Sequence, residues 1–560
     1  MKKLKKIISM SLVAIISAST FAGCTEYETG KEKVYTYDEA TTELSAFYKD
    51  IKKDTKTPRM DIYDDNSDVT TLADINTFPL SVEGNGSINI EIAAPSELSG
   101  SSPDDWLNVV AEDFNNEGKT INGKTVSVSI RKISSGEGLT YISEGIYKPE
   151  AYMPSSSAWG EMLKAKGIQV ETVKEKIIGN TAGILMKKDV YDEFISTYKT
   201  CSLDKVIDAT IDGKITFAYT NPYTSATGLN AIASALYAFD NKNPLSDTAK
   251  QKLNEYQKKS PPVAYTTGVL KTQAAKGIIN AMVMEEQAYV NEPKLKDYVY
   301  TPFGIRHDHP LYTFGYASQE EKEAVSMFGE YCLSEKNQSL GNSKGFNKHS
   351  EYQSQETGLD GKGYLAAQSI WKQAKDGGQP IIACFIADIS GSMDGTPLKS
   401  LKESLVATKK YISSSNYIGL VSYADTVHIE LPIEKFDESQ KAYFSGAVKD
   451  LNIEGATATY DAVLVAMQML LDKKQEIPNA KMMLFVLSDG DQNRGYSLDR
   501  IIPIVGGLKI PVYTIGYNIN DGSKAQQELT RLANVNEAAM INADSDDIVN
   551  QLRNLFNTQL

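Results

Sequence analysis

The six residues from Asp388 to Met393, with the sequence DISGSM, decide how the C-terminal third of this chain folds. They follow the apolar run 381–387 (IIACFIA), which is typical of a strand buried on both faces. A helix-like stretch, 397–413, begins shortly after them. Because loops at the carboxyl ends of parallel strands form the binding edge of an open α/β sheet, this position indicates a binding loop.

The alternation of apolar runs and helix-like stretches continues from this loop to the C-terminus. Three further runs have the composition of buried strands, at 417–423, 481–487 and 510–516. Two further stretches have helical patterns, at 458–473 and 523–534. Strands that alternate with helices predict a parallel sheet covered on both faces. Residues 379–560 are therefore predicted to form one doubly wound, Rossmann-like α/β domain.

Side chains with oxygen ligands gather at three of the predicted strand–helix junctions. The first junction supplies Asp388, Ser390 and Ser392, whose alternation lets one turn present three oxygens to a single point. Thr457 precedes a helix within the sequence GAT, and Asp489 follows a strand within LSDG. Two carboxylates and three hydroxyls form an all-oxygen set that suits Mg²⁺, with Mn²⁺ and Ca²⁺ as alternatives. The competing interpretation is a hydrogen-bonded cluster of turns that holds no metal.

The motifs DISGSM, GATATYDA and LSDG, in this order, resemble the metal-ion-dependent adhesion site (MIDAS) of the von Willebrand factor A (VWA) fold over residues 379–560. The resemblance implies that Ser390, Ser392 and Thr457 contact the metal. It also implies that Asp388 and Asp489 hold the waters of the metal. One coordination position would then remain for the Asp or Glu side chain of a protein partner.

Strand-like and helix-like stretches also alternate between residues 86 and 347. The strand-like runs are 87–94, 125–133, 182–186 and 215–218, and the helix-like stretches include 103–116 and 228–238. Loops rich in serine and threonine adjoin these elements, at 94–96, 134–139, 154–157 and 221–228. Hydroxyls and helix N-termini offer hydrogen bonds to polar or anionic groups. The pattern therefore predicts a second α/β domain with a polar cleft.

Together with AMVMEEQ (281–287), DHP (308–310) and the Gly-Phe pair at 345–346, these loops resemble those of extracellular solute-binding proteins. The resemblance implies a two-lobed, periplasmic-binding-protein-like (type 2) clamshell that binds a small polar or anionic solute. Glu285 and Glu286 stand where the family often carries Tyr-Glu, and an acid there disfavours a fully charged oxyanion. By their positions in the family pattern, five residues would line the cleft: Ser96, Ser135, Ser156, Ser225 and Thr227. The alternative is that these residues are ordinary turn and helix-cap residues.

The N-terminus predicts the compartment. Four lysines among the first six residues precede the apolar stretch 7–16, which is the layout of a secretory signal peptide. Ala22-Gly23-Cys24 resembles a bacterial lipobox, which implies cleavage after residue 23 and lipidation of Cys24. The protein is then extracytoplasmic and anchored to the cell membrane as a lipoprotein, whereas a plain signal peptide is the alternative.

Two segments connect these predicted parts. Residues 24–85 are rich in Thr, Tyr, Asp, Glu and Lys, and we interpret them as a tether with a short docking element. Residues 348–378 are interpreted as a connector between the two domains.

Several other classes of function are disfavoured. The net charge of −14 argues against nucleic-acid binding, which needs a concentrated positive surface. Residues 341–345 match the hydrolase pattern G-x-S-x-G, but no buried strand precedes them as a nucleophile elbow requires. His307 and His309 adjoin Pro310, and this spacing is more typical of a surface loop than of a metal site. We therefore expect a binding protein rather than an enzyme.

Three hypotheses follow from these patterns. The first is a cell-surface protein that captures a protein partner through its metal site. The second is the solute-binding component of an ABC-type importer, which would deliver its solute to a membrane permease. The third and least favoured is a metal-dependent hydrolase.

Overall fold

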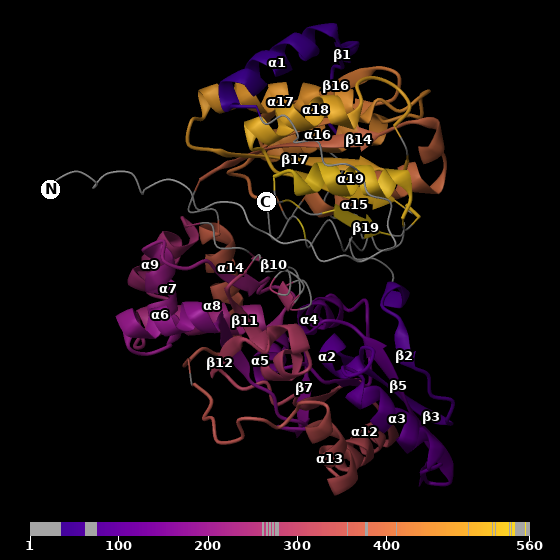
Figure 1. Ribbon diagram of the computed structural model, residues 1–560. Coiled ribbons are helices and arrows are strands. Elements are labelled where there is room, and N and C mark those ends of the chain that lie inside the picture. Colours follow the sequence, from indigo (N-terminus) through magenta and orange to yellow (C-terminus); the bar gives the residue numbers. More distant parts are fainter. Residues whose placement is uncertain are drawn as a thin grey trace, which may run out of the picture.

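The computed structural model describes residues 35–61, 75–259, 263–264, 267, 270–271, 274, 279–355, 357–375, 379–409, 412–490, 492–517, 519–520, 522–536, 538, 540–543 and 555. They form two α/β domains, each built on its own sheets (Figure 1). The central domain comprises residues 75–375, and the C-terminal domain comprises residues 379–555 together with residues 35–61. Cys24 lies outside the described residues. Within the described ranges, no helix has both the length and the apolarity that crossing a membrane requires.

The C-terminal domain contains a seven-stranded sheet with the order β1-β16-β15-β14-β17-β18-β19. Neighbouring strands run parallel except β15 and β16, which pair antiparallel. The central strand β14 is buried along its whole length, as its continuous apolar sequence predicts. In sheet order the strands are β1 (Lys53–Thr55), β16 (Val427–Lys435), β15 (Tyr417–Tyr423), β14 (Ile381–Asp388), β17 (Lys481–Ser488), β18 (Val512–Tyr517) and β19 (Met540–Ala543).

Helices cover both faces of this sheet, which confirms the predicted doubly wound fold. One face packs against α1 (Tyr37–Asp50), α17 (Thr459–Glu476), α18 (Leu498–Leu508) and α19 (Lys524–Asn534). The other packs against α15 (Thr396–Thr408) and α16 (Glu438–Asp450). Side chains of β14 alternate between the two cores, because Ile382 and Ile386 face the first and Phe385 faces the second.

The segment near the N-terminus belongs to the C-terminal domain. Helix α1 begins with a capping box formed by Thr36 and Glu39 and buries Ala40 and Leu44 in the core shared with α17 and α18. The short strand β1 then pairs in parallel with β16. The part of residues 24–85 that we interpreted from sequence as a docking element thus completes the sheet, and the central domain is inserted after it.

The first lobe of the central domain contains a sheet with the order β2-β5-β3-β6-β13-β7, and β4 pairs with β5. Its strands are β2 (Leu80–Val82), β3 (Ile88–Ala94), β4 (Thr120–Ile121), β5 (Lys124–Lys132), β6 (Ala151–Tyr152), β7 (Val170–Lys174) and β13 (Leu311–Phe314). Its helices are α2 (Ser96–Ser99), α3 (Trp106–Asn116), α4 (Ser135–Ser143), α5 (Ser157–Ala165), α12 (Gln319–Cys332) and α13 (Glu335–Ser343).

The second lobe contains a five-stranded sheet with the order β10-β9-β11-β8-β12. Its strands are β8 (Ala182–Lys187), β9 (Phe217–Thr220), β10 (Val263–Ala264), β11 (Ala281–Glu285) and β12 (Tyr298–Pro302). Its helices are α6 (Lys188–Tyr198), α7 (Leu203–Ile211), α8 (Ala226–Phe239), α9 (Asp247–Gln257) and α11 (Glu286–Val290).

The chain passes from the first lobe to the second between β7 and β8 and returns between β12 and β13. The two crossing segments pair at a single bridge, in which the Asn180 amide donates to the His307 carbonyl at 2.8 Å and the His307 amide donates back at 3.1 Å. This arrangement confirms the predicted two-lobed fold class.

The interpreted connector 348–378 contains a regular helix, α14 (Gly361–Ala374). This helix packs on α5 of the first lobe and on α8 of the second. Trp371 is fully buried, and its indole nitrogen donates to the Tyr219 hydroxyl at 2.7 Å. Helix α14 is therefore part of the central domain.

Candidate functional site

Three loops of the C-terminal domain meet at the carboxyl edge of its sheet. The first loop follows β14 and contains Ser390, Ser392 and the short 3₁₀ helix η3 (Gly391–Met393). The second precedes α17 and contains Thr457, and the third begins at Asp489, directly after β17. The Gly391 amide donates to the Gly455 carbonyl at 3.1 Å, so a backbone hydrogen bond joins the first two loops.

Four of the five predicted metal ligands form one hydrogen-bonded chain. The Asp388 carboxylate accepts from the Ser390 amide at 2.9 Å. The hydroxyls of Ser390 and Ser392 lie 3.1 Å apart, and the Ser392 hydroxyl donates to Asp489 at 2.8 Å. Residues nearly a hundred positions apart in sequence thus bring their oxygens together.

Asp388 is the most tightly held member of this cluster. Its side chain is fully buried, and its second oxygen accepts from the Ser488 hydroxyl at 2.7 Å and from the Tyr423 hydroxyl at 3.0 Å. Burial raises the pKa of Asp388 above its ordinary value even though these hydrogen bonds act in the opposite direction. The protein therefore holds a carboxylate in a position where its charge is poorly compensated.

Asp489 adds a second negative charge beside the first. Burial, and then repulsion from Asp388, raises the pKa of Asp489. Within the described part of the chain, neither carboxylate forms an ion pair with a Lys, Arg or His side chain. A divalent cation would supply the missing positive charge.

Thr457 lies in the adjoining loop without a hydrogen bond from its side chain to the other four residues. Its amide donates to the side chain of Asn493 at 2.9 Å, and its carbonyl accepts from the Asn493 amide at 3.0 Å. Asn493 was not singled out from sequence. Its position four residues after Asp489 shows that the loop after β17 holds the loop that contains Thr457.

The donor set fits a hard divalent cation because every candidate ligand is an oxygen. The described ranges contain no group of three or more His, Cys, Asp or Glu side chains suited to a metal. A metal at this edge would therefore depend on the serine and threonine hydroxyls as well as on the two carboxylates.

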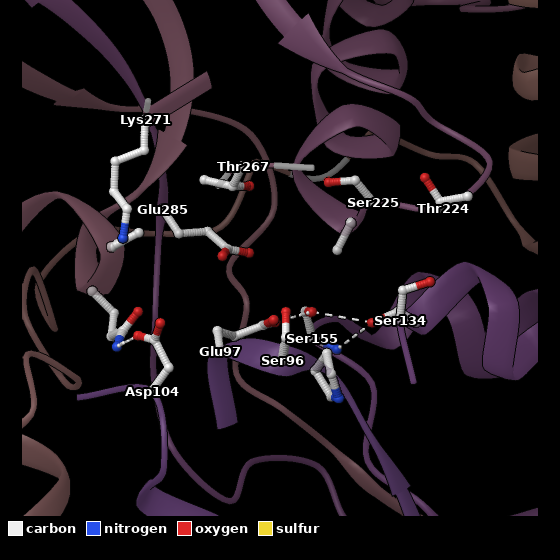
Figure 2. Close-up of a pocket in the computed structure, with 15 residues that line it drawn as sticks. Ser96, Glu97, Asp104, Ser134, Ser155, Thr224, Ser225, Thr267, Lys271 and Glu285 are labelled. Carbon is white, nitrogen blue, oxygen red and sulfur yellow. Dashed lines mark hydrogen bonds between the residues drawn. The ribbon is translucent and has the colours of Figure 1, made fainter. Parts of the chain in front are cut away.

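A second candidate site is a cavity of about 210 Å³ between the two lobes of the central domain (Figure 2). The cavity lies at the carboxyl ends of β3, β5 and β6 of the first lobe and of β9 and β11 of the second. Ser96, Ser135 and Ser225, three of the five predicted cleft residues, line it. Ser156 and Thr227 do not line it: Ser156 is buried at the start of α5, and Thr227 is fully buried in α8.

The cavity also contains charged and amide side chains that sequence analysis did not assign to it. Glu97 and Asp104 come from the first lobe, and Lys271 and Gln287 come from the second. Glu285, which the sequence analysis noted as an unusual acid, lines the cavity as well. Glu97 directly follows Ser96, and Gln287 ends the AMVMEEQ motif, so both had a usable signal, whereas no local pattern marks Asp104 and Lys271.

The prediction that His307 and His309 lie in a surface loop is wrong, because both side chains are fully buried. His307 Nδ1 lies 2.7 Å from Glu285, and His309 Nε2 lies 3.5 Å from Glu97. The two rings lie behind carboxylates of the cavity, on the segment that returns to the first lobe.

Two protein-family models match separate parts of the chain. Residues 98–347 match the bacterial extracellular solute-binding protein family, and residues 384–557 match the von Willebrand factor type A domain. The chain thus joins a part that matches the solute-binding protein family to a part that matches the von Willebrand factor type A domain. Both matches lie within the predicted domains and in the predicted order.

The relatives of known name resemble only parts of this chain. Human inter-alpha-trypsin inhibitor heavy chain H3 is 27% identical over 186 residues, which are 30% of this chain and 20% of that protein. The chain thus spans about a fifth of the length of the first curated relatives that it matches.

Solved structures align with each domain at low identity. Iron-bound HitA from Pseudomonas aeruginosa aligns with 52% of this chain and 99% of its own, at 16% identity and a TM-score of 0.37. A von Willebrand factor type A protein from Catenulispora acidiphila aligns with 32% of this chain and 42% of its own, at 19% identity and a TM-score of 0.29.

Proposed function

We propose that this protein is a lipid-anchored binding protein of the cell surface whose C-terminal domain holds Mg²⁺ and captures a protein partner. The observation that carries the proposal is the chain of contacts from Asp388 through Ser390 and Ser392 to Asp489. It combines two carboxylates that lack a cationic side chain with hydroxyl oxygens at the edge of a sheet where ligands bind.

The charges at this edge give the metal its proposed role. Bound Mg²⁺ would neutralise Asp388 and Asp489 and would retain a position for one further oxygen ligand. An Asp or Glu of a partner is the natural ligand there, since a charge-assisted contact in a partly dry site is stronger than one in water. Ser390, Ser392 and Thr457 would hold the cation by their hydroxyls.

The lipid anchor gives this site its proposed location. Lipidation at Cys24 would leave residues 25–36 between the lipid and the start of α1 at Tyr37. At roughly 3.3–3.6 Å per residue, a link of this length spans at most about 47 Å. Because α1 belongs to the C-terminal domain, the link would attach this domain rather than the central one to the membrane.

The test is capture of partners from native membranes by the full chain, with and without EDTA. We expect a set of captured proteins that needs Mg²⁺ and is lost in Asp388→Ala. The matched control is Asp472→Ala, which removes an exposed carboxylate of α17. This carboxylate accepts a hydrogen bond from Gln468 and interacts electrostatically with Tyr48. Capture that persists in EDTA or in Asp388→Ala would refute the proposal.

A second candidate function is that of an importer component, and the cavity between the lobes favours it. In that case the central domain would carry a solute to a membrane permease, and the C-terminal domain would serve to hold it in place. Saturable binding of a solute, with a matching rise in the Tm of the protein, would support this candidate.

A further inference from the structure

We propose that the cavity between the lobes takes a small solute with a protonated amine rather than an oxyanion. This inference rests on the second candidate function, solute binding by the central domain, and does not depend on the metal site. It follows from the carboxylate and amide oxygens that face the cavity. It also follows from the hydrogen bonds that three of the serine hydroxyls there already donate to protein acceptors.

The cavity is lined by three carboxylates, from Glu97, Asp104 and Glu285. Figure 2 shows Glu97 and Asp104 extending from one side and Glu285 and Lys271 from the opposite side. Burial raises the pKa of Asp104, although Gln287 and Lys271 act in the opposite direction. A bound cation would relieve this cost, whereas an anion would increase it.

Gln287 adds an unsatisfied acceptor to these carboxylates. Its side chain is fully buried and lines the cavity, and its Nε2 donates to Asp104 at 2.7 Å. The Asp104 carboxylate can accept a hydrogen bond from the amide nitrogen of Gln287 but not from its amide oxygen. This contact therefore fixes which end of the amide faces Asp104. Among the residues that the structure describes, the amide oxygen then has no hydrogen-bond partner. A buried acceptor without a partner costs free energy, and a ligand that donates a hydrogen bond to it removes this cost. An ammonium group has three N–H donors.

Glu285 receives a hydrogen bond from its histidine neighbour rather than a positive charge. His307 Nε2 lies 3.4 Å from the side-chain amide of Asn230, whose nitrogen also donates to a carbonyl at 2.8 Å. This geometry makes Nε2 an acceptor, so the proton of a neutral ring lies on Nδ1 and is donated to Glu285. A neutral histidine orients the carboxylate without neutralising it.

Glu97 differs, because His309 compensates its charge. His309 Nδ1 lies 3.0 Å from the Ile178 carbonyl and is therefore a donor. Burial opposes ionisation of both groups, but the contact between His309 and Glu97 outweighs it, lowering the pKa of Glu97 and raising that of His309. The carboxylates of Asp104 and Glu285 are therefore the groups that would attract a cationic solute, and the charge of Lys271 acts against them.

Three of the serine hydroxyls at the cavity, those of Ser134, Ser135 and Ser155, are committed to protein acceptors. Ser155 donates to Glu97, and the Ser135 hydroxyl lies 3.1 Å from that of Ser155, so Ser135 donates to Ser155. Ser134, at the start of α4, donates to Glu137 at 2.7 Å. Glu137 also places a carboxylate in the first turn of α4, where it offsets the positive end of the helix dipole.

The experiment is a calorimetric titration of the full chain with four probes, three of which have a four-carbon chain. These three are 1,4-diaminobutane, 4-aminobutyrate and succinate, which differ in charge, and the fourth is sulfate. We expect at least one of the two amines to bind saturably and to raise the Tm, and we expect no binding of succinate or sulfate.

Two isosteric variants locate the binding. Glu285→Gln retains an oxygen for His307 and Asp104→Asn retains one for Gln287, and each should weaken binding of the amine about tenfold or more through loss of a charge-assisted contact. The control Glu255→Gln, on the exposed side of α9, should bind as the unaltered protein does. Unchanged circular dichroism and Tm without ligand would show that the variants fold.

The failures are distinguishable. Binding of succinate or sulfate without binding of an amine would overturn the charge assignment but would support solute binding as such. Binding of no probe would overturn this inference, whereas the importer candidate would fall only if no solute bound saturably. Amine binding that Glu285→Gln and Asp104→Asn leave unchanged would place the amine elsewhere. None of these results bears on the metal site.

Discussion

At the scale of single residues, the central feature is a buried carboxylate that the protein satisfies with hydrogen bonds but not with charge. Asp388 accepts from one backbone amide and two hydroxyls, and Asp489 stands close enough to repel it. Such an arrangement is costly in the folded protein unless a cation joins it. The same groups that would bind Mg²⁺ should therefore destabilise the metal-free domain.

The raised pKa of Asp388 predicts the sign of a pH effect. A carboxyl whose pKa is raised on folding stabilises the fold below its ordinary value, and this contribution is lost as pH rises through the raised value. In EDTA, the free energy of unfolding of the unaltered protein should therefore fall relative to that of Asp388→Asn as the pH rises through the raised pKa of Asp388. At pH 7 the unaltered protein should be the less stable of the two. Mg²⁺ at pH 7 should raise the Tm of the unaltered protein and leave that of Asp388→Asn unchanged. Equal pH profiles for the two proteins in EDTA would contradict the argument.

The motifs were sufficient to bring the candidate metal ligands to one edge of the sheet, but they identified only three of the residues that line the cavity. Ser390, Ser392 and Asp489 fall at junctions that a parallel sheet brings to one edge, so their proximity follows from local pattern and topology. Gln287 and His309 are different, because their roles arise only when two lobes close around the same space. A sequence pattern shows the element on which a residue lies, but not the opposing surface that it faces.

At the scale of elements, helix α1 comes from the N-terminal part of the chain but packs in the core of the C-terminal domain. Its buried residues pack on α17 and α18, and Gly507 of α18 permits the close approach, since a Cβ there would lie 2.7 Å from that of Ala40. Strand β1 then adds to the sheet beside β16. The C-terminal domain therefore needs residues from before the central domain to complete its core.

Removal of the α1 contact should destabilise the C-terminal domain. Leu44 is fully buried, so Leu44→Ala should lower the free energy of unfolding by about 2–4 kcal/mol through loss of burial and creation of a cavity. The exposed neighbour Thr42→Ala is the control and should change it by less than about 1 kcal/mol. Denaturant unfolding followed by circular dichroism measures both, and equal values would show that α1 does not contribute to the core.

Element prediction succeeded where periodicity was strong and failed where pairing is non-local. The predicted strand 417–423 coincides with β15. The predicted helix 103–116 begins three residues later, at Trp106, and ends at Asn116 as predicted. Strand β1 pairs with β16 from more than 370 residues away, and this pairing has no local signal. The antiparallel hairpin of β15 and β16, joined by residues 424–426, was also missed, although the sequence of β16 alternates apolar and polar residues.

At the scale of the whole molecule, the order of the segments predicts how the protein is held at the membrane. The proposed lipid site precedes α1 by a link of twelve residues, 25–36, and α1 belongs to the domain with the candidate metal centre. The central domain, with its cavity, is inserted between β1 and β14. Both proposed binding sites would therefore be held at the surface by one link.

Replacement of Cys24 tests this link. Cys24→Ser removes the thiol that would carry the lipid, so the protein should move from the membrane fraction to the medium or the soluble fraction. Cys201→Ser, which replaces a free cysteine of the central domain, should remain with the membrane. Fractionation followed by immunoblotting measures the distribution, and a Cys24→Ser protein that stays in the membrane would contradict lipid anchoring at this residue.

The most direct test of the central claim is a titration of the metal-free full chain with Mn²⁺, followed by electron paramagnetic resonance of the free ion. The account predicts one saturable site per chain that Mg²⁺ competes for and that Asp388→Ala abolishes, while Asp472→Ala retains it. Absence of saturable binding, or a site that survives in Asp388→Ala, would contradict the claim that these oxygens hold a divalent cation.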